Sequence, residues 1–378
     1  MEFHLIRLWL AMMALYLAGG LVYPLFSLYM SSRDLGDVEI GAIASAASLA
    51  SLASVVILGR CSDLLARREA LQASLCASQA LILPAYTLAH SFPQFLVLHP
   101  AYMAVSMATM TLSGAVAMDY ISERRGALFG RLRTSGAVGW VFGTLLNGYL
   151  AERYGYWASF TASATALAAS AALYAPGAPR RTLAQRPAPL RLAPMAKQMA
   201  PLLAAVAVAS VSNPAYYTFL PLFVVRELGA TPMAASLAFM ITPFAEIPAM
   251  VALGSLSDRA GRLRAVALCL AAYPLRYSLT AASQAPSHAI VVQMLHGLTF
   301  GGLYVVSTAY LAEAAGGAAG LALSLYTVAS NLGGIAGGYL LAYVASLYGF
   351  RIMYLAAAAI SSLSLPLLLM AKRWLKTM

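Results

Sequence analysis

The sequence predicts an all-α membrane protein with twelve transmembrane helices in two six-helix bundles related by pseudo-two-fold symmetry. Three observations lead to this prediction: an apolar composition, apolar segments of membrane-spanning length along the whole chain, and a repeat of the first half in the second. Of the 378 residues, 61% are hydrophobic and only 10% are charged. Mean hydropathy is +0.76, well above the range of water-soluble domains, so we expect lipid to be the main solvent.

Apolar segments of about 20 residues match the thickness of the bilayer core, where each backbone amide must bond within its own helix. We expect spans at about 5–30, 39–60, 69–89, 93–119, 127–151, 155–175, 197–226, 232–256, 264–282, 286–313, 319–345 and 350–372. The first segment is long and lacks a small-residue cleavage site after it, so we interpret it as a retained helix and not as a signal peptide.

Basic residues gather on one side of the predicted spans. With the N-terminus in the cytoplasm, only Arg33, Arg153, Arg226 and Arg351 fall on the opposite side. This distribution obeys the positive-inside rule, so we expect both termini to be cytoplasmic and the protein to lie in the cell membrane. The net charge of +11 then reflects topology, and we do not expect nucleic acid as a partner. The three cysteines lack metal-type spacing, and we expect no metal and no cofactor.

A segment rich in proline and arginine divides the chain. It predicts three parts: an N-terminal six-helix bundle over 1–175, a cytoplasmic linker over 176–196 and a C-terminal six-helix bundle over 197–378. The two bundles repeat each other at a spacing of about 195 residues, so that Gly59 and Asp63 correspond to Gly254 and Asp258. Parallel repeats joined in this way are typical of secondary transporters, in which two bundles rock about a site near the middle of the membrane.

Two loops carry related charged motifs. The segment 254–262 reads Gly-Ser-Leu-Ser-Asp-Arg-Ala-Gly-Arg, and the segment 59–68 retains its Gly, its Asp and its terminal arginines. The motif resembles the loop signature of the major facilitator superfamily. A carboxylate at a helix end can pair with arginines across the loop, which predicts a latch on the cytoplasmic face. The gate residues that we expect are Gly59, Asp63, Arg67, Arg68, Asp119, Gly254, Asp258, Arg259, Gly261, Arg262 and Glu313.

Within the superfamily, two motifs resemble the lactose permease, nucleoside and phenylpropionate proton symporter group. They are Phe-Gly-Arg-Leu-Arg-Thr-Ser-Gly-Ala-Val-Gly-Trp at 129–140 and Gln-Met-Leu-His-Gly-Leu-Thr-Phe-Gly at 293–301. The resemblance implies that Arg133 and Trp140 contact the solute. The carboxylates that hold the sugar and release the proton in lactose permease are replaced here by Ala115 and Thr299, so the resemblance carries over neither galactoside specificity nor that proton route.

Glu246 and Arg276 lie deep within predicted spans. A charge that faces lipid costs about 3 kcal/mol or more, so both must face the bundle interior, and we expect them to meet. One hypothesis is that Glu246 binds the coupled proton under the control of Arg276; the alternative is a static pair that only fixes two helices. His296 joins the hypothesis because its protonation can change near neutral pH, although a hydrogen-bonded polar role is equally compatible.

Polar and aromatic residues on the predicted spans supply groups for a central solute site. With Arg133 and Trp140, the expected substrate-binding residues are Asn213, Tyr216, Tyr217, Gln293, Thr299, Asn331, Tyr16 and Tyr23. Several of these aromatics are also explained by packing or by interfacial anchoring.

These observations predict a secondary active transporter that moves a small polar or amphipathic solute, of the sugar, nucleoside or aromatic acid class, by alternating access with proton symport. The alternative within transport is efflux of sugars or drugs by proton antiport. A channel is a further alternative, although the duplicated gating loops favour a transporter with two alternating gates. We do not expect an enzyme, because the sequence has no nucleophile–base pair, metal cluster or phosphate loop. We expect a monomer whose partners are the solute, protons and the lipid bilayer.

Overall fold

The computed structural model describes residues 2–63, 67–120, 125–175, 192–314 and 319–369, and every regular element in these ranges is helical. Seven stretches of them have the length and apolar composition needed to cross a membrane. They are His4–Ser31, Asp37–Leu58, Phe92–Asp119, Met199–Tyr217, Pro232–Ala260, Pro286–Ala314 and Leu323–Leu369. The predicted linker 176–196 lies mostly outside the described residues, but its last five positions already belong to a helix that begins at Leu192.

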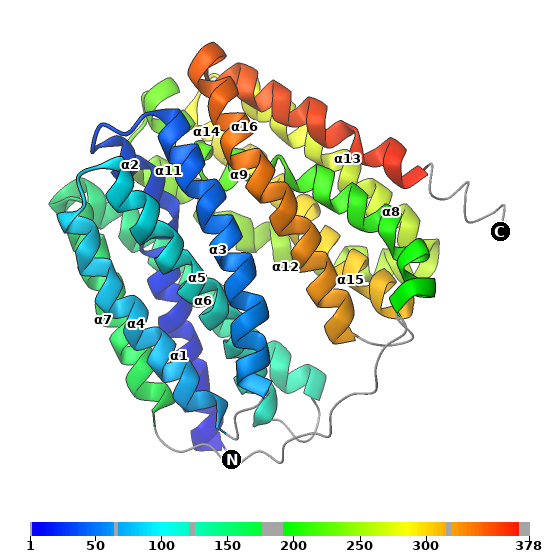
Figure 1. The fold of residues 1–378 in the computed structure, drawn as a ribbon, viewed down its shortest axis with the longest axis horizontal. Coiled ribbons are helices and arrows are strands. Elements are labelled where there is room, and N and C mark those ends of the chain that lie inside the picture. Colours follow the sequence, from blue (N-terminus) through cyan, green and yellow to red (C-terminus); the bar gives the residue numbers. More distant parts are fainter. Residues whose placement is uncertain (1, 64–66, 121–124, 176–191, 315–318, 370–378) are drawn as a thin grey trace. The chain divides into compact units, whose positions relative to one another are not determined.

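The described residues form two compact units, and the first consists of residues 1–35, 46–187 and 231–240 within the described ranges. Its elements are α1 (Glu2–Gly20), η1 (Tyr23–Leu25), α2 (Phe26–Ser31), most of α3 (Asp37–Asp63), α4 (Arg68–Leu88), α5 (Phe92–Asp119), α6 (Arg125–Tyr154), α7 (Tyr156–Tyr174) and α11 (Pro232–Met240). In this unit α1 packs between α6 and α7, and α4 packs between α5 and α7 (Figure 1).

Close packing in the first unit depends on small residues, because lipid supplies no hydrophobic drive for helix association. A Cβ atom at Gly20 would lie 2.7 Å from the carbonyl oxygen of Trp140, so α1 and α6 meet backbone to backbone. A side-chain hydroxyl group joins α7 to α1: Ser163 donates a hydrogen bond of 2.8 Å to the carbonyl of Ala18. The core of this unit is aromatic, with Phe26 of α2 in edge-to-face contact with Tyr102 of α5.

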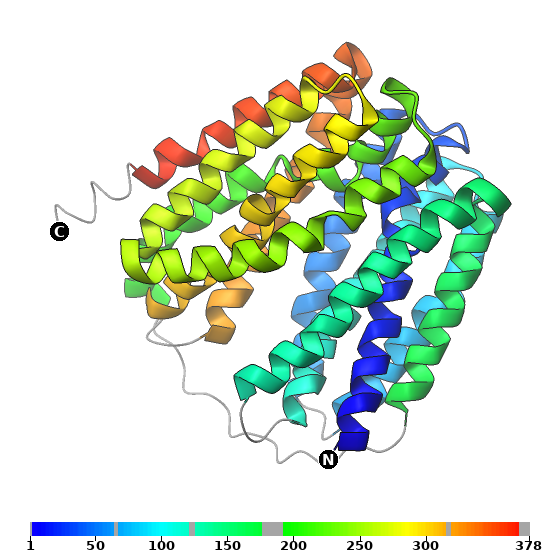
Figure 2. The ribbon, with the colours of Figure 1, turned by 180° about the vertical axis from the view of Figure 1, so that it is seen from behind.

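The second unit consists of residues 36–45, 188–230 and 241–378 within the described ranges. Its elements are the start of α3, α8 (Leu192–Ser210), α9 (Asn213–Tyr217), α10 (Phe219–Leu222), η2 (Phe223–Glu227), α12 (Thr242–Ala260), α13 (Arg262–Ala281), α14 (Pro286–Val292), η3 (Gln293–Leu295), η4 (Gly297–Gly302), α15 (Leu303–Ala314) and α16 (Ala319–Ser362). Here α16 packs against α8, α13 and α15, and α12 packs against η4 (Figure 2).

Several predicted spans are interrupted helices. The predicted span 197–226 consists of α8, α9, α10 and η2, and 286–313 consists of α14, η3, η4 and α15. Two predicted spans, 319–345 and 350–372, are joined as α16, which turns at Gly349 with φ of 81°. That conformation requires glycine in practice, because a Cβ atom would clash with the backbone. The interruptions matter because they bring polar side chains together within the second unit.

Candidate functional site

Arg276 is the most buried charged residue of the second unit and the centre of its polar cluster. Its guanidinium donates from Nε and Nη2 to the Gln293 Oε1 atom, at 3.1 and 2.6 Å, and from Nη1 to Thr299 Oγ1 at 3.0 Å. Only 2% of Arg276 is exposed. Burial of a cation in a membrane protein is tolerated only where polar groups replace its water, and these acceptors do so.

Glu246 and His296 form the second part of the cluster. The Glu246 Oε1 atom lies 3.3 Å from His296 Nε2. The Glu246 side chain is 22% exposed and that of His296 is 5% exposed, so one partner of the pair reaches solvent-accessible space and the other is enclosed. The Nδ1 atom of His296 is buried without a hydrogen-bond partner among the described residues.

Aromatic rings connect the two parts. The Tyr216 ring stacks on His296 with centroids 4.3 Å apart, and the Arg276 guanidinium lies 4.5 Å from the centroid of the same ring. On its own helix, His296 stacks on Phe300 at 5.2 Å. A cation over an aromatic face is stabilised by the ring quadrupole, most strongly where water is excluded. The guanidinium of Arg276 and the imidazole of His296 therefore contact the same ring, that of Tyr216.

Helix geometry explains why one short stretch, Gln293 to Thr299, supplies three members of the cluster. Gln293 begins the 3₁₀ turn η3, and His296 links this turn to the π-helical turn η4, which contains Thr299. In a 3₁₀ helix residues three apart are eclipsed, so Gln293 and His296 share a face. The π-helical turn packs tightly on α12: a Cβ atom at Gly297 would lie 2.5 Å from the carbonyl oxygen of Ala245. Glycine there allows His296 to approach Glu246.

The predicted contact between Glu246 and Arg276 is replaced by two separate arrangements. Arg276 bonds to the uncharged side chains of Gln293 and Thr299, and the recorded ion pair of Glu246 runs to His296. The expectation that the acid and the base pair directly is therefore corrected. Its physical reason is that Gln293, one 3₁₀ turn before His296, already occupies the hydrogen-bonding edge of the guanidinium.

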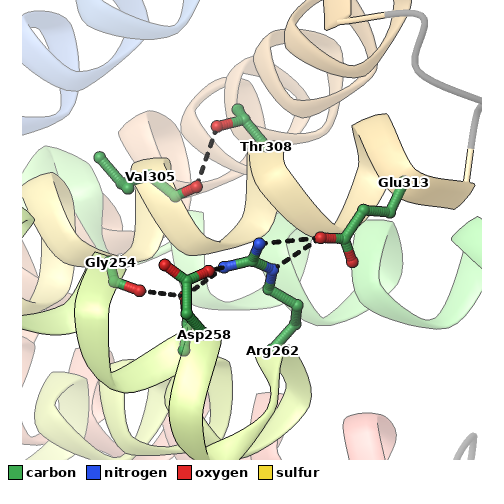
Figure 3. A network of polar contacts seen from close by, with 7 residues as sticks. Gly254, Asp258, Arg262, Val305, Thr308 and Glu313 are labelled. Atoms are coloured by element: carbon green, nitrogen blue, oxygen red, sulfur yellow. Dashed lines mark hydrogen bonds and ion pairs between the residues drawn. The ribbon is translucent and has the colours of Figure 1, made fainter.

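The charged loop between α12 and α13 forms the second polar network (Figure 3). Arg262 bridges two carboxylates: its Nη1 atom donates to Asp258 Oδ1 at 2.5 Å, and its Nε atom donates to Glu313 Oε1 at 2.9 Å. The hydrogen bond to Glu313 is the largest of the causes that raise the pKa of Arg262. Gly261 separates α12 from α13 with φ of 94°. Gly254 and Arg259 both lie in the C-terminal part of α12.

The first unit contains the corresponding ion pair. Arg68 Nη1 lies 3.4 Å from Asp119 Oδ1, and both this pair and Arg262–Glu313 span 51 residues. Arg67 is exposed just before α4. The surroundings of Gly59 and the side chain of Asp63 lie outside the described residues.

A buried cluster beside that pair was missed by sequence reasoning. Arg7 bonds to Glu69 at 3.2 Å and to the Tyr120 hydroxyl at 2.9 Å, and this hydroxyl also donates to Glu69. Burial and the hydrogen bond to Glu69 raise the pKa of Tyr120. The signal available in the sequence was Glu69 itself, directly after Arg68 and at the same 51-residue spacing from Tyr120.

The remaining predicted solute-binding residues are spread over both units. In the first, Tyr23 lies 5.9 Å from Trp140 and bonds to Ser106, and the ring of Tyr16 borders Gly136. The side chain of Arg133 lies outside the described residues. In the second, Tyr217 contacts Tyr216 at 4.8 Å, Asn213 begins α9, and Asn331 donates to the Thr327 carbonyl on α16. Among the described residues no group of His, Cys, Asp and Glu could hold a metal ion.

The model of the MFS_1 like family matches residues 5–356. The chain belongs to this family, within the major facilitator superfamily. It is therefore a multi-pass membrane transporter with a small-molecule substrate. Family membership and solved structures together confirm the predicted fold class of twelve helices in two bundles.

A curated relative is the multidrug resistance protein MdtG of Dickeya zeae (strain Ech586), 26% identical over 372 residues that cover 93% of this chain and 90% of the relative. The nucleoside transporter NupG superposes with a TM-score of 0.83, at 14% identity, over 97% of this chain and 98% of NupG. A bacterial homologue of the human lysosomal transporter Spinster gives a TM-score of 0.76, also at 14% identity, over 98% and 97%. At this identity the structures establish the fold alone.

Proposed function

We propose that this MFS_1-like transporter moves a small polar or amphipathic organic solute, of the sugar, nucleoside or aromatic acid class, by alternating access and in symport with protons. The observation that supports this proposal is the Glu246–His296 pair beside the buried Arg276. Ionisable groups within membrane spans are expensive to maintain and mark proton and substrate routes in transporters.

The proton occupies the Glu246–His296 pair. With His296 neutral, its Nε2–H group donates to the carboxylate, and the buried Nδ1 atom presents a free lone pair. The partly exposed Glu246 receives the proton and shares it with the enclosed imidazole. A group that is reached from one side at a time fulfils the requirement for coupling, because the proton then crosses only when the protein changes conformation.

The conformational change in this proposal is a rocking motion of the two halves of the protein about the site that contains this pair. In the proposal, residues 1–175 and 197–378 rock as two bundles joined by the linker 176–196, and the predicted gate residues latch the cytoplasmic face. Tyr16, Tyr23, Arg133 and Trp140 contact the solute from the first half, and Asn213, Tyr216, Tyr217, Gln293, Thr299 and Asn331 contact it from the second. The transporter acts as a monomer in the cell membrane, with both termini in the cytoplasm.

Flux into proteoliposomes with an imposed pH gradient tests the proposal. Symport predicts that solute accumulates on the alkaline side and that dissipation of the gradient stops accumulation. The variant Glu246→Gln should lose accumulation but retain exchange of internal for external solute, because exchange needs no net proton movement. Accumulation that persists in Glu246→Gln would contradict the role of this carboxylate.

A second candidate function is efflux by proton antiport, favoured by the relative named as a multidrug resistance protein. The same vesicles distinguish the two, because an antiporter concentrates its solute on the acidic side. In antiport the cluster would bind the proton and the solute in turn, whereas in symport it binds both at once.

A further inference from the structure

Several arginines form ion pairs within the described residues, and Arg276 differs from them because its hydrogen bonds go to uncharged groups. The acceptors are Gln293 Oε1 and Thr299 Oγ1, whereas Arg7, Arg68, Arg226, Arg262 and Arg351 each contact a carboxylate. Even the two of them that are buried, Arg7 and Arg68, with side chains 10% and 9% exposed, contact a carboxylate. The arginine that most needs a counter-charge therefore has none in direct contact within the described residues.

The charge of the cluster changes with the proposed proton. In the described cluster the members that carry or can take a charge near neutral pH are Arg276, Glu246 and His296; the phenols of Tyr216, Tyr217 and Tyr277, which face His296 or Arg276, are neutral there. With Glu246 ionised and His296 neutral, the charges of Glu246 and Arg276 balance. Once the pair accepts a proton, one positive charge is left over, at a place where the nearest acceptors of Arg276 are neutral. An uncompensated charge inside a membrane protein is strongly unfavourable.

The geometry at Gln293 indicates what compensates this charge. A single oxygen accepts from both Nε and Nη2 of Arg276, which is the edge that binds carboxylate and phosphate groups through two parallel hydrogen bonds. Gln293 thus occupies an anion position with a neutral amide. Its own amide nitrogen donates to the Ala289 carbonyl at 2.9 Å, a hydrogen bond that does not depend on Arg276.

We propose that the transported solute carries an acidic group, a carboxylate or a phosphate, which replaces the Gln293 oxygen on Arg276 when the Glu246–His296 pair is protonated. This inference rests on the proposed symport and narrows its solute class to acids. The anion and the proton enter together because each removes the charge that the other would leave unbalanced. For a monoanion, the loaded cycle moves no net charge across the membrane.

Matched pairs of acid and neutral solute test the inference. The pairs are glucuronate and glucose, uridine monophosphate and uridine, and 3-phenylpropionate and 3-phenylpropionamide, each in equilibrium binding to purified wild-type protein. In at least one pair, the acid should bind roughly tenfold or more tightly than its neutral partner, since hydrogen bonds to charged groups are the stronger ones. Equal binding within all three pairs, or tighter binding of the neutral members, overturns the proposal.

The variant Gln293→Glu supplies an internal anion at the same position. It should weaken binding of the preferred acid by roughly tenfold or more, and should weaken binding of the acid more than binding of its neutral partner. The control variant Gln284→Glu adds the same charge at an exposed site in the loop before α14 and should leave the acid preference intact. An acid preference that survives in a folded Gln293→Glu protein contradicts the inference.

Flux separates this inference from the proposed function. Accumulation of a neutral solute driven by the pH gradient, without acid binding, would support symport and overturn the acid class. Acid binding without any response of flux to the pH gradient would support the acid site and contradict symport. For a transported monoanion, a change of membrane potential at constant pH gradient should leave the initial rate unchanged; a rate that follows the potential contradicts the charge balance.

Discussion

His296 lies against Glu246 on one side and against the ring of Tyr216 on the other, so that one imidazole contacts both the acid and the aromatic residue over which Arg276 sits. This arrangement makes the imidazole the link between the proton site and the cation. The amide variant His296→Asn would shorten the side chain and remove the ring from the stack. We expect it to abolish the coupled flux even where Glu246 is intact.

The first prediction concerns that link. In His296→Asn, uphill transport should fall to the level of Glu246→Gln, and the double variant should be no worse than either single one, because residues that act as a unit are not additive. Initial rates under a fixed pH gradient provide the measurement. A double variant whose loss equals the product of the two single losses would show that the residues act independently.

The second prediction concerns the tight contact between η4 and α12. Gly297→Ala places a methyl group 2.5 Å from the carbonyl oxygen of Ala245, so the two elements must separate. We expect a loss of stability of about 1–3 kcal/mol, seen as a lower unfolding temperature in detergent, together with impaired transport. For stability, Gly254→Ala is the matched control, since its methyl group would meet only Val305, at 3.8 Å. Equal shifts of the unfolding temperature in the two variants would contradict this account.

The third prediction concerns the gate network of Arg262. Asp258 and Glu313 are 64% and 58% exposed, and exposed pairs contribute only about 1 kcal/mol or less to stability. The unfolding temperature of Glu313→Gln should therefore be nearly unchanged. The same energy alters a conformational equilibrium by up to about fivefold, so the alkylation rate of a cysteine introduced at Ser255 should change. An unaltered rate with altered unfolding would indicate a purely structural pair.

The fourth prediction separates the buried cluster of the first unit from its exposed neighbour. Arg7 and Glu69 have side chains 10% and 4% exposed, and removal of one partner of a buried pair costs about 3–5 kcal/mol. Glu69→Ala should lower the unfolding temperature strongly, whereas Asp119→Ala, at 23% exposure, should lower it much less. Thermal unfolding of the two variants in the same detergent compares them, and the reverse order would contradict the assignment.

Much of the fold could be predicted from the sequence because lipid imposes strict rules. Apolar segments of a fixed length must be helices, and the confirmed fold class follows from them together with the repeat. The interruptions were harder to predict. Nothing in the pattern of Gln293 to Gly302 distinguishes a 3₁₀ turn and a π-helical turn from a regular helix, because the segment is too short for a difference in residues per turn to show in its sequence.

The site was predicted in part for the same reason. Glu246, Arg276 and His296 could be predicted because they are ionisable residues within predicted spans. Which of them pair depends on the direction in which each side chain leaves its helix, and the helix interruptions change that direction. Phe300, which stacks on His296, was overlooked because an aromatic residue in a membrane helix is unremarkable by itself. The Arg7 cluster was overlooked because the predicted topology alone explained an arginine near the start of the first helix.

The π-helical turn η4 also bears on how this helix tolerates changes of length. A π-helical turn bonds each amide to the carbonyl five residues back, so it holds one residue more than an α-helix needs to cover the same path. Deleting a single residue between Gly297 and Gly302 would let the segment close into an α-helix while α15 keeps its orientation. A deletion in α15 itself would instead rotate everything after it by about 100°, the angle between successive residues of an α-helix.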